Sequence, residues 1–221
     1  MSLRAQLQGA LPVTAPLVLN PLMARMAEAA GFAAIEIEDQ LVPKRAHHHV
    51  GNEHMIPIEL MAAKVKEAVA ARRSPDFLIV GRTNAMRASD MDDALRRGEA
   101  YRRAGADLVL LSMAHRPEQL RAIAERLGGP LMYLAGRGGL AGSGLTLKDL
   151  GGLGYKIVAD PSTPLLAAFV AWKKVYADLA QDFGSAQPKT DWSPVEHEML
   201  KVIDIEKLLA VERATVEKGQ D

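Results

Sequence analysis

Short apolar runs alternate with longer helical patterns along most of this chain, and this alternation leaves few folds open. Six runs rich in β-forming residues read as strands, at 17–19, 33–37, 77–80, 107–111, 131–134 and 156–158. Apolar residues that recur every three or four positions predict helices at 22–30, 58–73, 91–104, 118–127, 147–153 and 164–179. Because strands that alternate with helices form parallel sheets, we expect an α/β fold.

Two architectures fit this order of elements, an open doubly wound sheet and a closed barrel. No glycine-rich fingerprint of the dinucleotide-binding type follows any predicted strand, which favours the barrel. A complete barrel of eight βα units needs about 250 residues, whereas this chain has 221 and changes character after residue 180. We therefore expect residues 1–180 to form a TIM-type (β/α) barrel that is shortened to about six βα units.

Residues 181–221 are expected to form a linker and a C-terminal helical extension. The segment 181–194 is rich in Gly, Ser, Pro, Asp and Gln, which is typical of a connector. Apolar residues then recur at helical spacing over 195–216, namely Leu200, Ile203, Ile205, Leu208, Leu209 and Val216. An apolar stripe with no place inside the barrel predicts an oligomer contact, in a homodimer or homotetramer. A helix folded back over its own barrel is the alternative.

Composition excludes several classes of protein. The chain has no cysteine, so it is not a disulfide scaffold, and its 27 basic residues balance 27 acidic ones. Nucleic acid is therefore not expected as a partner, because a basic surface is lacking. No segment approaches the roughly 20 apolar residues of a membrane span, and residues 1–10 lack the apolar region of a signal peptide. We expect a cytoplasmic protein without membrane contact.

A dense cluster of residues able to carry chemistry follows the apolar run at 33–37. It contains two carboxylates, two cations and a histidine triplet, which are Glu38, Asp39, Lys44, Arg45 and His47 to His49. In parallel α/β proteins the carboxyl ends of the strands point into a shared mouth, where ligands bind. Adjacent histidines on an extended loop point in opposite directions, so the triplet is not expected to form a tetrahedral metal site. The cluster as a whole is a candidate site.

Several motifs follow one another in a specific order from about residue 24 to residue 180. They are Glu38-Asp39-Gln40, Pro43-Lys44-Arg45, His48, Gly51, Pro57, Pro75-Asp76-Phe77, Gly81-Arg82-Thr83-Asn84-Ala85, Asp93-Ala94 and Tyr101 to Asp107. This series closely resembles the isocitrate lyase and phosphoenolpyruvate mutase superfamily. The resemblance implies a barrel enzyme, usually a tetramer with an exchanged C-terminal helix, that makes or breaks a C–C or P–C bond. It also implies that Mg²⁺ binds a 2-oxo acid or enolate and neutralises its charge.

The resemblance implies roles for four residues at two strand ends. Glu38 would hold Mg²⁺ through the water shell of the metal, and Asp39 would be its metal-binding neighbour and support. Arg82 would grip the carboxylate of the substrate with its planar fork of donors, and it would act in catalysis as well as in binding. Asn84 would be a further substrate contact. The substrate would be a small carboxylic acid.

The resemblance also places Lys44, Arg45 and His48 on a loop that closes over the substrate. Lys44 and His48 would be catalytic, and Arg45 and His48 would bind substrate. Related lyases carry Lys-Lys/Arg-Cys-Gly-His here, whereas this chain has Ala46 in place of the cysteine. Because alanine cannot transfer a proton, cysteine-dependent isocitrate cleavage is not expected. The expected activity is Mg²⁺-dependent C–C cleavage of a 2-oxo acid or a 2-hydroxy di- or tricarboxylate through an enolate.

Two further departures from the superfamily bear on this expectation. Asn84 stands where the usual motif has an aspartate, and two βα units that normally precede the strand before Glu38 are absent. The absent units carry metal-binding aspartates and a substrate-binding loop, so we expect weak Mg²⁺ binding and low or absent lyase activity. Loss of two staves would also leave unpaired strand edges, unless the strands at 17–19 and 33–37 pair directly or a partner subunit covers the gap.

Several alternatives remain open. Glu38 or Asp39 would also fit a helix cap or a pairing with Arg45, and Arg82 would also fit a structural ion pair. The chain would then be a catalytically impaired relative that serves as an oligomeric binding protein. Chemistry of the oxaloacetate decarboxylase or phosphonopyruvate type is a further alternative. A third class is a phosphate-binding barrel that uses the glycine-rich run 136–144, although a surface loop explains this run equally well.

Overall fold

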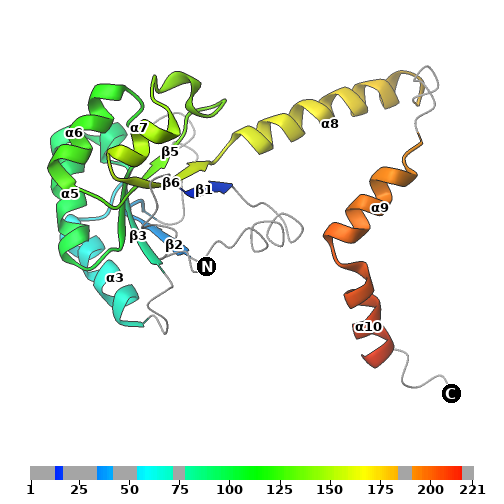
Figure 1. The fold of residues 1–221 in the computed structure, drawn as a ribbon, viewed down its shortest axis with the longest axis horizontal. Helices are drawn as coiled ribbons and strands as arrows, with labels where there is room; N and C mark the ends of the chain where they lie inside the picture. Colours follow the sequence, from blue (N-terminus) through cyan, green and yellow to red (C-terminus); the bar gives the residue numbers. More distant parts are fainter. Residues whose placement is uncertain (1–12, 17–33, 42–53, 72–77, 184–190, 216–221) are drawn as a thin grey trace. The chain divides into compact units, whose positions relative to one another are not determined.

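The computed structural model describes residues 13–16, 34–41, 54–71, 78–183 and 191–215 (Figure 1). These residues belong to two compact units, and the boundary between them lies between Leu165 and Leu166. The first unit contains a β-sheet and the helices that cover it. The second contains most of one long helix and two shorter ones. The predicted division of the chain at residue 180 stays a prediction.

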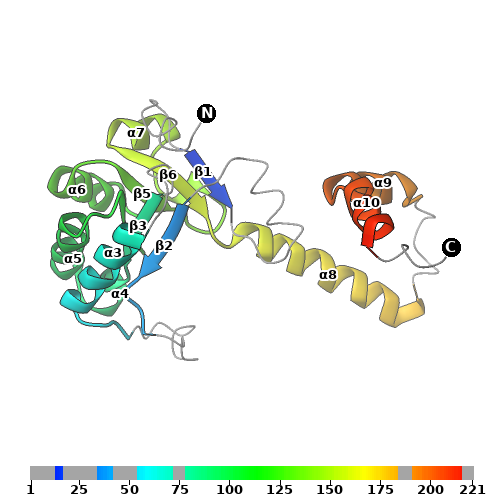
Figure 2. The same cartoon turned by 90° about the horizontal axis from the view of Figure 1, so that it is seen from below.

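The sheet of the first unit is entirely parallel, as the order of elements predicts. Its six strands are β1 (Val13–Pro16), β2 (Ala34–Glu38), β3 (Leu78–Thr83), β4 (Leu108–Leu111), β5 (Leu131–Leu134) and β6 (Tyr155–Asp160). They pair in the order β1-β6-β5-β4-β3-β2, so neighbours in sequence are neighbours in space from β2 to β6. Figure 2 shows the strands lying side by side. The predicted α/β class is confirmed, and the described residues contain six strands.

The strands β1 and β2 stand at opposite ends of this order. Direct pairing between them would have closed a barrel of six strands, but among the described strands no such pair forms. This is where the superfamily resemblance places the two absent βα units. A barrel that lacks two adjacent strands is left with two strand edges where those strands would be, because each remaining strand still pairs with its neighbour on the other side.

Two of the predicted elements differ from the structure. The first strand is Val13–Pro16, whereas the predicted strand at 17–19 and the predicted helix at 22–30 lie outside the described residues. The predicted helix at 195–216 is wrong as a single element, because α9 (Ser193–Val202) and α10 (Ile205–Thr215) are separate. Asp204, between them, adopts a positive φ of 53°, which interrupts a right-handed helix. Spacing alone did not reveal this break.

Helices cover one face of the sheet, and among the described residues the side chains of the strands pack against one another on the other face. The covering helices are α3 (Ile58–Ala71), α5 (Met91–Arg103), α6 (Pro117–Leu127) and α7 (Leu147–Gly152), joined by the short α4 (Ala85–Ala88) and a 3-10 turn at Leu140–Gly142. The face away from the helices buries Leu78, Val80, Leu108, Leu110, Met132, Ile157 and Ala159 against one another. Because both faces are buried, the strands are almost continuous apolar runs.

Two glycines determine how α5 packs on the sheet and how the chain leaves it. Gly105, just after the end of α5, has φ of 102° and turns the chain into β4. Gly81 lies in β3, where a Cβ would come within 2.9 Å of the Cβ of Tyr101 on α5. Absence of a side chain at Gly81 therefore lets α5 lie directly on β3. This close approach brings polar residues of α5 to the carboxyl end of β2.

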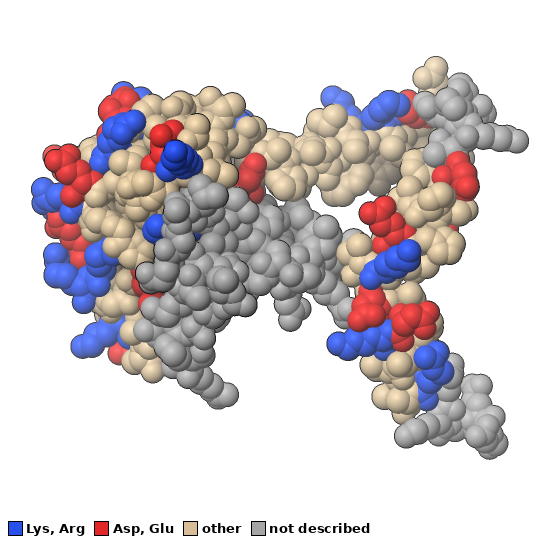
Figure 3. All heavy atoms as spheres, viewed as in Figure 1, with Lys and Arg blue, Asp and Glu red and all other residues tan. Residues whose placement is uncertain are grey.

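The second unit consists of helices with many exposed apolar side chains. It includes α8 (Thr163–Asp182) from Leu166 onward, together with α9 and α10. On α8, Phe169, Val170, Trp172 and Tyr176 are each more than half exposed. In Figure 3 uncharged atoms dominate the visible surface of α8. Among the described residues, no helix is both long and apolar enough to cross a membrane.

Candidate active site

The predicted strand-end residues Glu38 and Arg82 lie side by side. They are register partners on the neighbouring strands β2 and β3, and their side chains point to the same face of the sheet. Arg82 Nε lies 3.4 Å from Glu38 Oε2, and Arg82 Nη1 donates to Glu36 Oε1 at 2.8 Å. Glu36 points the same way because it precedes Glu38 by two residues on the strand. One guanidinium is thus held between two carboxylates.

Asn84 links these groups through its side-chain amide. Its Nδ2 donates to Glu38 Oε2 at 3.2 Å, and its Oδ1 accepts bonds from Arg82 Nε and Nη2 at 3.1 and 3.0 Å. The amide offers a donor to Glu38 and an acceptor to Arg82, whereas an aspartate here would face Glu38 with like charge. The departure of Asn84 from the superfamily pattern therefore fits the observed ion pair.

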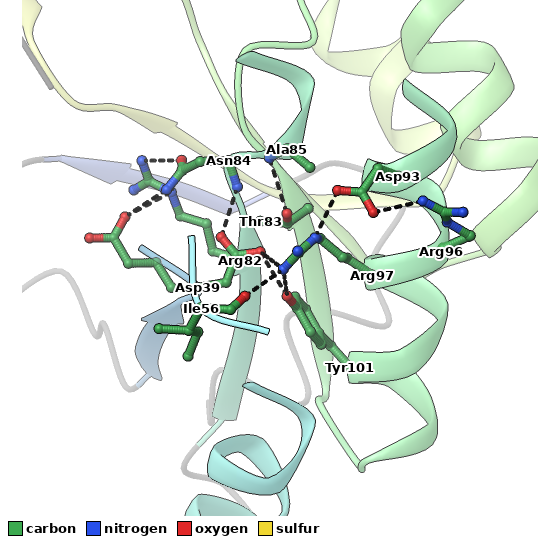
Figure 4. A network of polar contacts seen from close by, with 11 residues as sticks. Asp39, Ile56, Arg82, Thr83, Asn84, Ala85, Asp93, Arg96, Arg97 and Tyr101 are labelled. Carbon is green, nitrogen blue, oxygen red and sulfur yellow. Dashed lines mark hydrogen bonds and ion pairs between the residues drawn. The ribbon is translucent and has the colours of Figure 1, made fainter. Parts of the chain in front are cut away.

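Asp39 lies behind this group and is fully buried (Figure 4). Its Oδ1 accepts a bond from the backbone N–H of Asn84 at 3.1 Å. Its Oδ2 accepts bonds from the Tyr101 hydroxyl at 2.7 Å and from Arg97 Nη1 at 3.1 Å. Both carboxylate oxygens are therefore occupied by donors. Asp39 fixes Asn84, and Asn84 in turn orients Glu38 and Arg82.

The two side-chain donors to Asp39, Arg97 and Tyr101, come from one face of α5. Asp93, Arg97 and Tyr101 are spaced by four residues, and Arg97 Nε also donates to Asp93 Oδ2 at 2.9 Å. Burial and the adjacent charge of Asp39 raise the pKa of Tyr101, so its hydroxyl keeps the proton that it donates. Burial alone would lower the pKa of Arg97, but its bonds to Tyr101 and Asp93 and the charge of Asp39 raise it overall. The network therefore stays charged and paired.

A cavity of about 300 Å³ lies at the carboxyl ends of β3 to β6, and Arg82 is one of the residues that line it. Arg82 and Asn84 form its wall at β3, Ser112 and His115 follow β4, and Arg137 follows β5. Its position agrees with the general rule that ligands of parallel α/β proteins bind beyond the carboxyl ends of the strands. Arg82 thus faces a space in which a small carboxylate fits.

Four of the predicted site residues are brought together, and three are not described. Glu38, Asp39, Arg82 and Asn84 form the cluster above, whereas Lys44, Arg45 and His48 lie in the segment 42–53, outside the described residues. The two ends of that segment are joined by an antiparallel bridge between Gln40 and Met55. The segment therefore leaves and re-enters the described structure next to Asp39. The roles of all these residues stay predictions.

The described carboxylates do not fit Mg²⁺ in this arrangement. Asp39 has no oxygen without a donor, while Glu36 and Glu38 are each within ion-pair distance of Arg82. Within the part of the chain that the structure describes, no group of three His, Asp or Glu side chains is placed to hold a metal ion. This geometry favours a supporting role for Asp39 over direct coordination, since Mg²⁺ requires free oxygen ligands.

Sequence reasoning missed several residues that shape this site. Tyr101 lies in one of the motifs that resemble the superfamily, and Arg97 lies between two of them. The sequence did not predict that their side chains donate hydrogen bonds to Asp39. The four-residue spacing from Asp93 was the available signal, because it predicts one polar stripe on an otherwise sheet-covering helix. Glu36 carried a similar signal, since it shares the strand face of Glu38. Other missed residues line the cavity, and they are Arg87, Ser112, His115 and Arg137.

Comparison with known proteins gives a consistent result. A family model described as phosphoenolpyruvate phosphomutase matches residues 21–180. The chain is 36% identical to 2,3-dimethylmalate lyase of Eubacterium barkeri over 155 residues, which are 70% of this chain and 53% of that enzyme. It is also 36% identical to 2-methylisocitrate lyase of Aeropyrum pernix, over 71% of this chain and 50% of the relative. The chain thus spans about half the length of these relatives.

Solved structures show the same fold. A crystal structure of 2,3-dimethylmalate lyase, a member of the PEP mutase/isocitrate lyase superfamily, matches with a TM-score of 0.75 at 18% identity, over 99% of this chain and 98% of that one. Phosphonopyruvate hydrolase in complex with oxalate and Mg²⁺ matches with a TM-score of 0.59 at 26% identity, over 98% of this chain and 80% of that one. The expected shortened barrel architecture agrees with these neighbours.

Proposed function

Because the chain belongs to the phosphoenolpyruvate phosphomutase family, we propose that it is a carbon–carbon lyase that acts on a small carboxylic acid. The substrate class is a 2-oxo acid or a 2-hydroxy di- or tricarboxylate. Relatives named as lyases of 2,3-dimethylmalate and 2-methylisocitrate support this class. Relatives named oxaloacetate decarboxylase and phosphonopyruvate hydrolase support decarboxylation or phosphonopyruvate-type chemistry as an alternative.

The observation that carries the proposal is the placement of Arg82. Its guanidinium is held in a fixed orientation by Glu36, Glu38 and Asn84, and the residue lines the cavity at the strand ends. A planar fork of donors binds a carboxylate with two parallel hydrogen bonds, which fixes the orientation of the substrate as well as its position. Arg82 is therefore the proposed anchor for the substrate carboxylate.

The chemistry that follows requires charge stabilisation. When the C–C bond breaks, its electron pair remains on the carbon next to a carbonyl or carboxylate group and is delocalised as an enolate. A preorganised cation near the oxygen of that enolate lowers the barrier, because it needs no reorganisation during the reaction. Arg82 supplies such a charge. His48, outside the described residues, is the proposed proton donor or acceptor in place of the cysteine of related lyases.

Mg²⁺ is the proposed cofactor, and it would supply further charge neutralisation when bound. The complex of phosphonopyruvate hydrolase with oxalate and Mg²⁺ supports this part of the proposal. Glu38 is the proposed contact to the water shell of the metal, with Asp39 as its neighbour. Because the described carboxylates are already bonded, we expect weak Mg²⁺ binding and slow turnover.

Homo-oligomerisation and a cytoplasmic location complete the proposal. The exposed apolar side chains of α8, α9 and α10 support a contact between copies of the chain, in a dimer or tetramer. They include Phe169, Trp172, Val195 and Met199, each at least half exposed. Neither nucleic acid nor a membrane is a proposed partner.

The test combines oxalate binding with turnover. Oxalate mimics an enolate, so isothermal titration should detect its binding, and Arg82→Gln should weaken that binding at least about tenfold, the value of one lost charged hydrogen bond. Arg121→Gln is the matched control, because Arg121 is an exposed residue of α6 that does not line the cavity. Slow cleavage of 2-methylisocitrate, dimethylmalate, oxaloacetate or phosphonopyruvate is expected. Submillimolar Mg²⁺ binding would contradict the expected weak metal site.

A second candidate is an oligomeric binding protein without catalysis. The specific observation in its favour is that Glu36, Glu38 and Asp39 are all bonded to cationic or neutral donors. Intact oligomers that bind oxalate through Arg82 but cleave none of the four substrates, with or without Mg²⁺, would favour this function over the lyase.

A further inference from the structure

The guanidinium of Arg82 is already engaged by protein groups on all three of its nitrogens. Its Nε and Nη2 donate to Asn84 Oδ1 at 3.1 and 3.0 Å, and its Nη1 donates to Glu36 Oε1 at 2.8 Å. A guanidinium has five N–H groups, one on Nε and two on each terminal nitrogen. Among the described residues, these bonds therefore leave one N–H on Nη1 and one on Nη2. Glu36 shares one of the two nitrogens that a ligand would use.

Glu36 is held less firmly than its neighbour Glu38. Glu38 Oε2 faces Arg82 and also accepts a bond from Asn84 Nδ2, and its side chain is 18% exposed. Within the described residues, the ion pair with Arg82 is the one polar contact of Glu36, whose side chain is 30% exposed. A partly exposed ion pair contributes little stability, because water solvates both charges when they separate. Glu36 is thus able to leave Arg82 without becoming a buried, unpaired charge.

A carboxylate that binds Arg82 from the cavity would meet the charge of Glu36. Arg82 lines the cavity and Glu36 does not, so the two anions reach the guanidinium from different sides. A ligand that takes one N–H on each terminal nitrogen would share Nη1 with Glu36. Like charges this close repel each other, and they do so more strongly near a protein surface than in bulk water. Binding therefore requires that Glu36 turn away from Arg82.

We propose that Glu36 competes with the ligand carboxylate for Arg82 and thereby favours ligands that carry less negative charge. The inference rests on the proposed function in that Arg82 is the anchor for a substrate carboxylate. The ligand restores the charged hydrogen bond that Arg82 loses when Glu36 leaves, so the exchange lowers the affinity without preventing binding. Asn84 keeps its bonds to Nε and Nη2 during the exchange, and the plane of the guanidinium stays fixed.

Isothermal titration with oxalate and oxamate, without divalent metal, tests this competition. The two ions have the same skeleton, but oxamate carries an amide in place of one carboxylate. Glu36→Gln should tighten oxalate at least about fivefold and oxamate by a smaller factor, because the repulsion scales with the charge of the ligand. Glu125→Gln is the matched control, since Glu125 is an exposed residue of α6 outside the cavity, and it should change neither affinity.

A second measurement needs no carboxylate ligand. Phenylglyoxal modifies guanidinium groups, and mass spectrometry of the digested chain gives the rate at each arginine. Arg82 should react at least about twofold faster in Glu36→Gln than in the wild type, because a neutral amide holds Nη1 less strongly than a carboxylate does. Arg121, an exposed residue of α6, is the internal reference, and its rate should be the same in both chains.

Oxalate that binds the wild type through Arg82 at least as tightly as it binds Glu36→Gln overturns the inference and leaves the proposed anchor intact. An equal gain for oxalate and oxamate overturns the selection by charge. If neither chain binds oxalate, the proposed anchor fails, and the rate at Arg82 decides the inference separately. Faster modification in Glu36→Gln then supports the competition, whereas an unchanged rate overturns it.

Discussion

Tyr101→Phe is a minimal test of the claim that Asp39 is a buried support for the site. The substitution removes one oxygen atom, the hydroxyl that donates to Asp39 Oδ2 at 2.7 Å, and it leaves the aromatic ring in place. The close contact of α5 with Gly81 involves Cβ of Tyr101, which both residues have. The variant should therefore pack as the wild type does, and its effect should report the bonds of the hydroxyl, namely the short one to Asp39 and the longer one that it accepts from Arg97 Nη1 at 3.4 Å.

The expected magnitude follows from the surroundings of Asp39. A hydrogen bond to a charged group contributes about 1.5–3 kcal/mol, and Asp39 is fully buried, so water cannot replace the lost donor. Arg97 and the N–H of Asn84 remain bonded to the carboxylate. The loss should thus stay below the roughly 3–5 kcal/mol of an unpaired buried charge. We expect about 2 kcal/mol of destabilisation, because one of three donors is removed.

Urea unfolding followed by far-UV circular dichroism measures this loss of unfolding free energy. The m-value should be unchanged, because both proteins should expose the same surface on unfolding. Tryptophan fluorescence is unsuitable, because Trp172 and Trp192 are the two tryptophans of the chain and both belong to the helical second unit. Tyr176→Phe is the matched control, since Tyr176 is 69% exposed, and it should change the free energy of unfolding by less than about 0.5 kcal/mol.

A loss below about 0.5 kcal/mol in Tyr101→Phe would refute the reasoning, because it would mean that Asp39 does not depend on the hydroxyl. A double-mutant cycle with Asp39→Asn gives an independent check. The two changes act on one hydrogen bond, so their effects should fall short of additivity by about 1 kcal/mol or more. Additive effects would place the two side chains in separate interactions.

Three further results are expected. Gly81→Ala should destabilise the protein by about 1–3 kcal/mol in urea unfolding, because its Cβ would lie 2.9 Å from the Cβ of Tyr101, whereas Gly152→Ala, with nothing within 4 Å, should be harmless. Burial alone would raise the pKa of Asp93, but bonds from two arginines on α5 lower it below its usual 3.8. Its stabilising effect is therefore complete above that value and lost as pH falls through the lower folded pKa, so Asp93→Asn should cost about 1 kcal/mol at pH 7 and progressively less as the pH falls through that folded pKa. Light scattering after gel filtration should show a dimer or tetramer, and Trp172→Asp should shift it toward monomer; a monomeric wild type would refute the oligomer.

The sequence predicted those parts of the fold that depend on local pattern. The strands β2 to β6 lie where β-rich apolar runs occur, since a strand buried on both faces must be apolar throughout. The stop at Gly105 also followed from local chemistry, because its backbone conformation suits glycine. The meeting of Glu38 and Arg82 was predictable as well, since both end neighbouring parallel strands.

Other features depend on contacts that no local pattern encodes. The break at Asp204 depends on one backbone angle within a continuous apolar stripe. The bonds of Asp39 to Arg97 and Tyr101 join residues about sixty positions apart, as their sequence separations of 58 and 62 show. Arg137 and His115 line one cavity because β4 and β5, which they follow, are adjacent. Resemblance to a family does not predict such residues, because it reports only the positions that relatives share.

The two ends of the strand order have a consequence for solubility. An edge strand offers unpaired N–H and C=O groups to any other extended chain, and natural proteins discourage such addition with proline or with inward-pointing charge. Here β1 ends at Pro16, which has no N–H to donate, and β2 turns Glu36 and Glu38 toward the face that its neighbours keep apolar. These residues make both edges poor templates for aggregation. Replacing them by β-branched apolar residues would make inclusion bodies the expected product of expression.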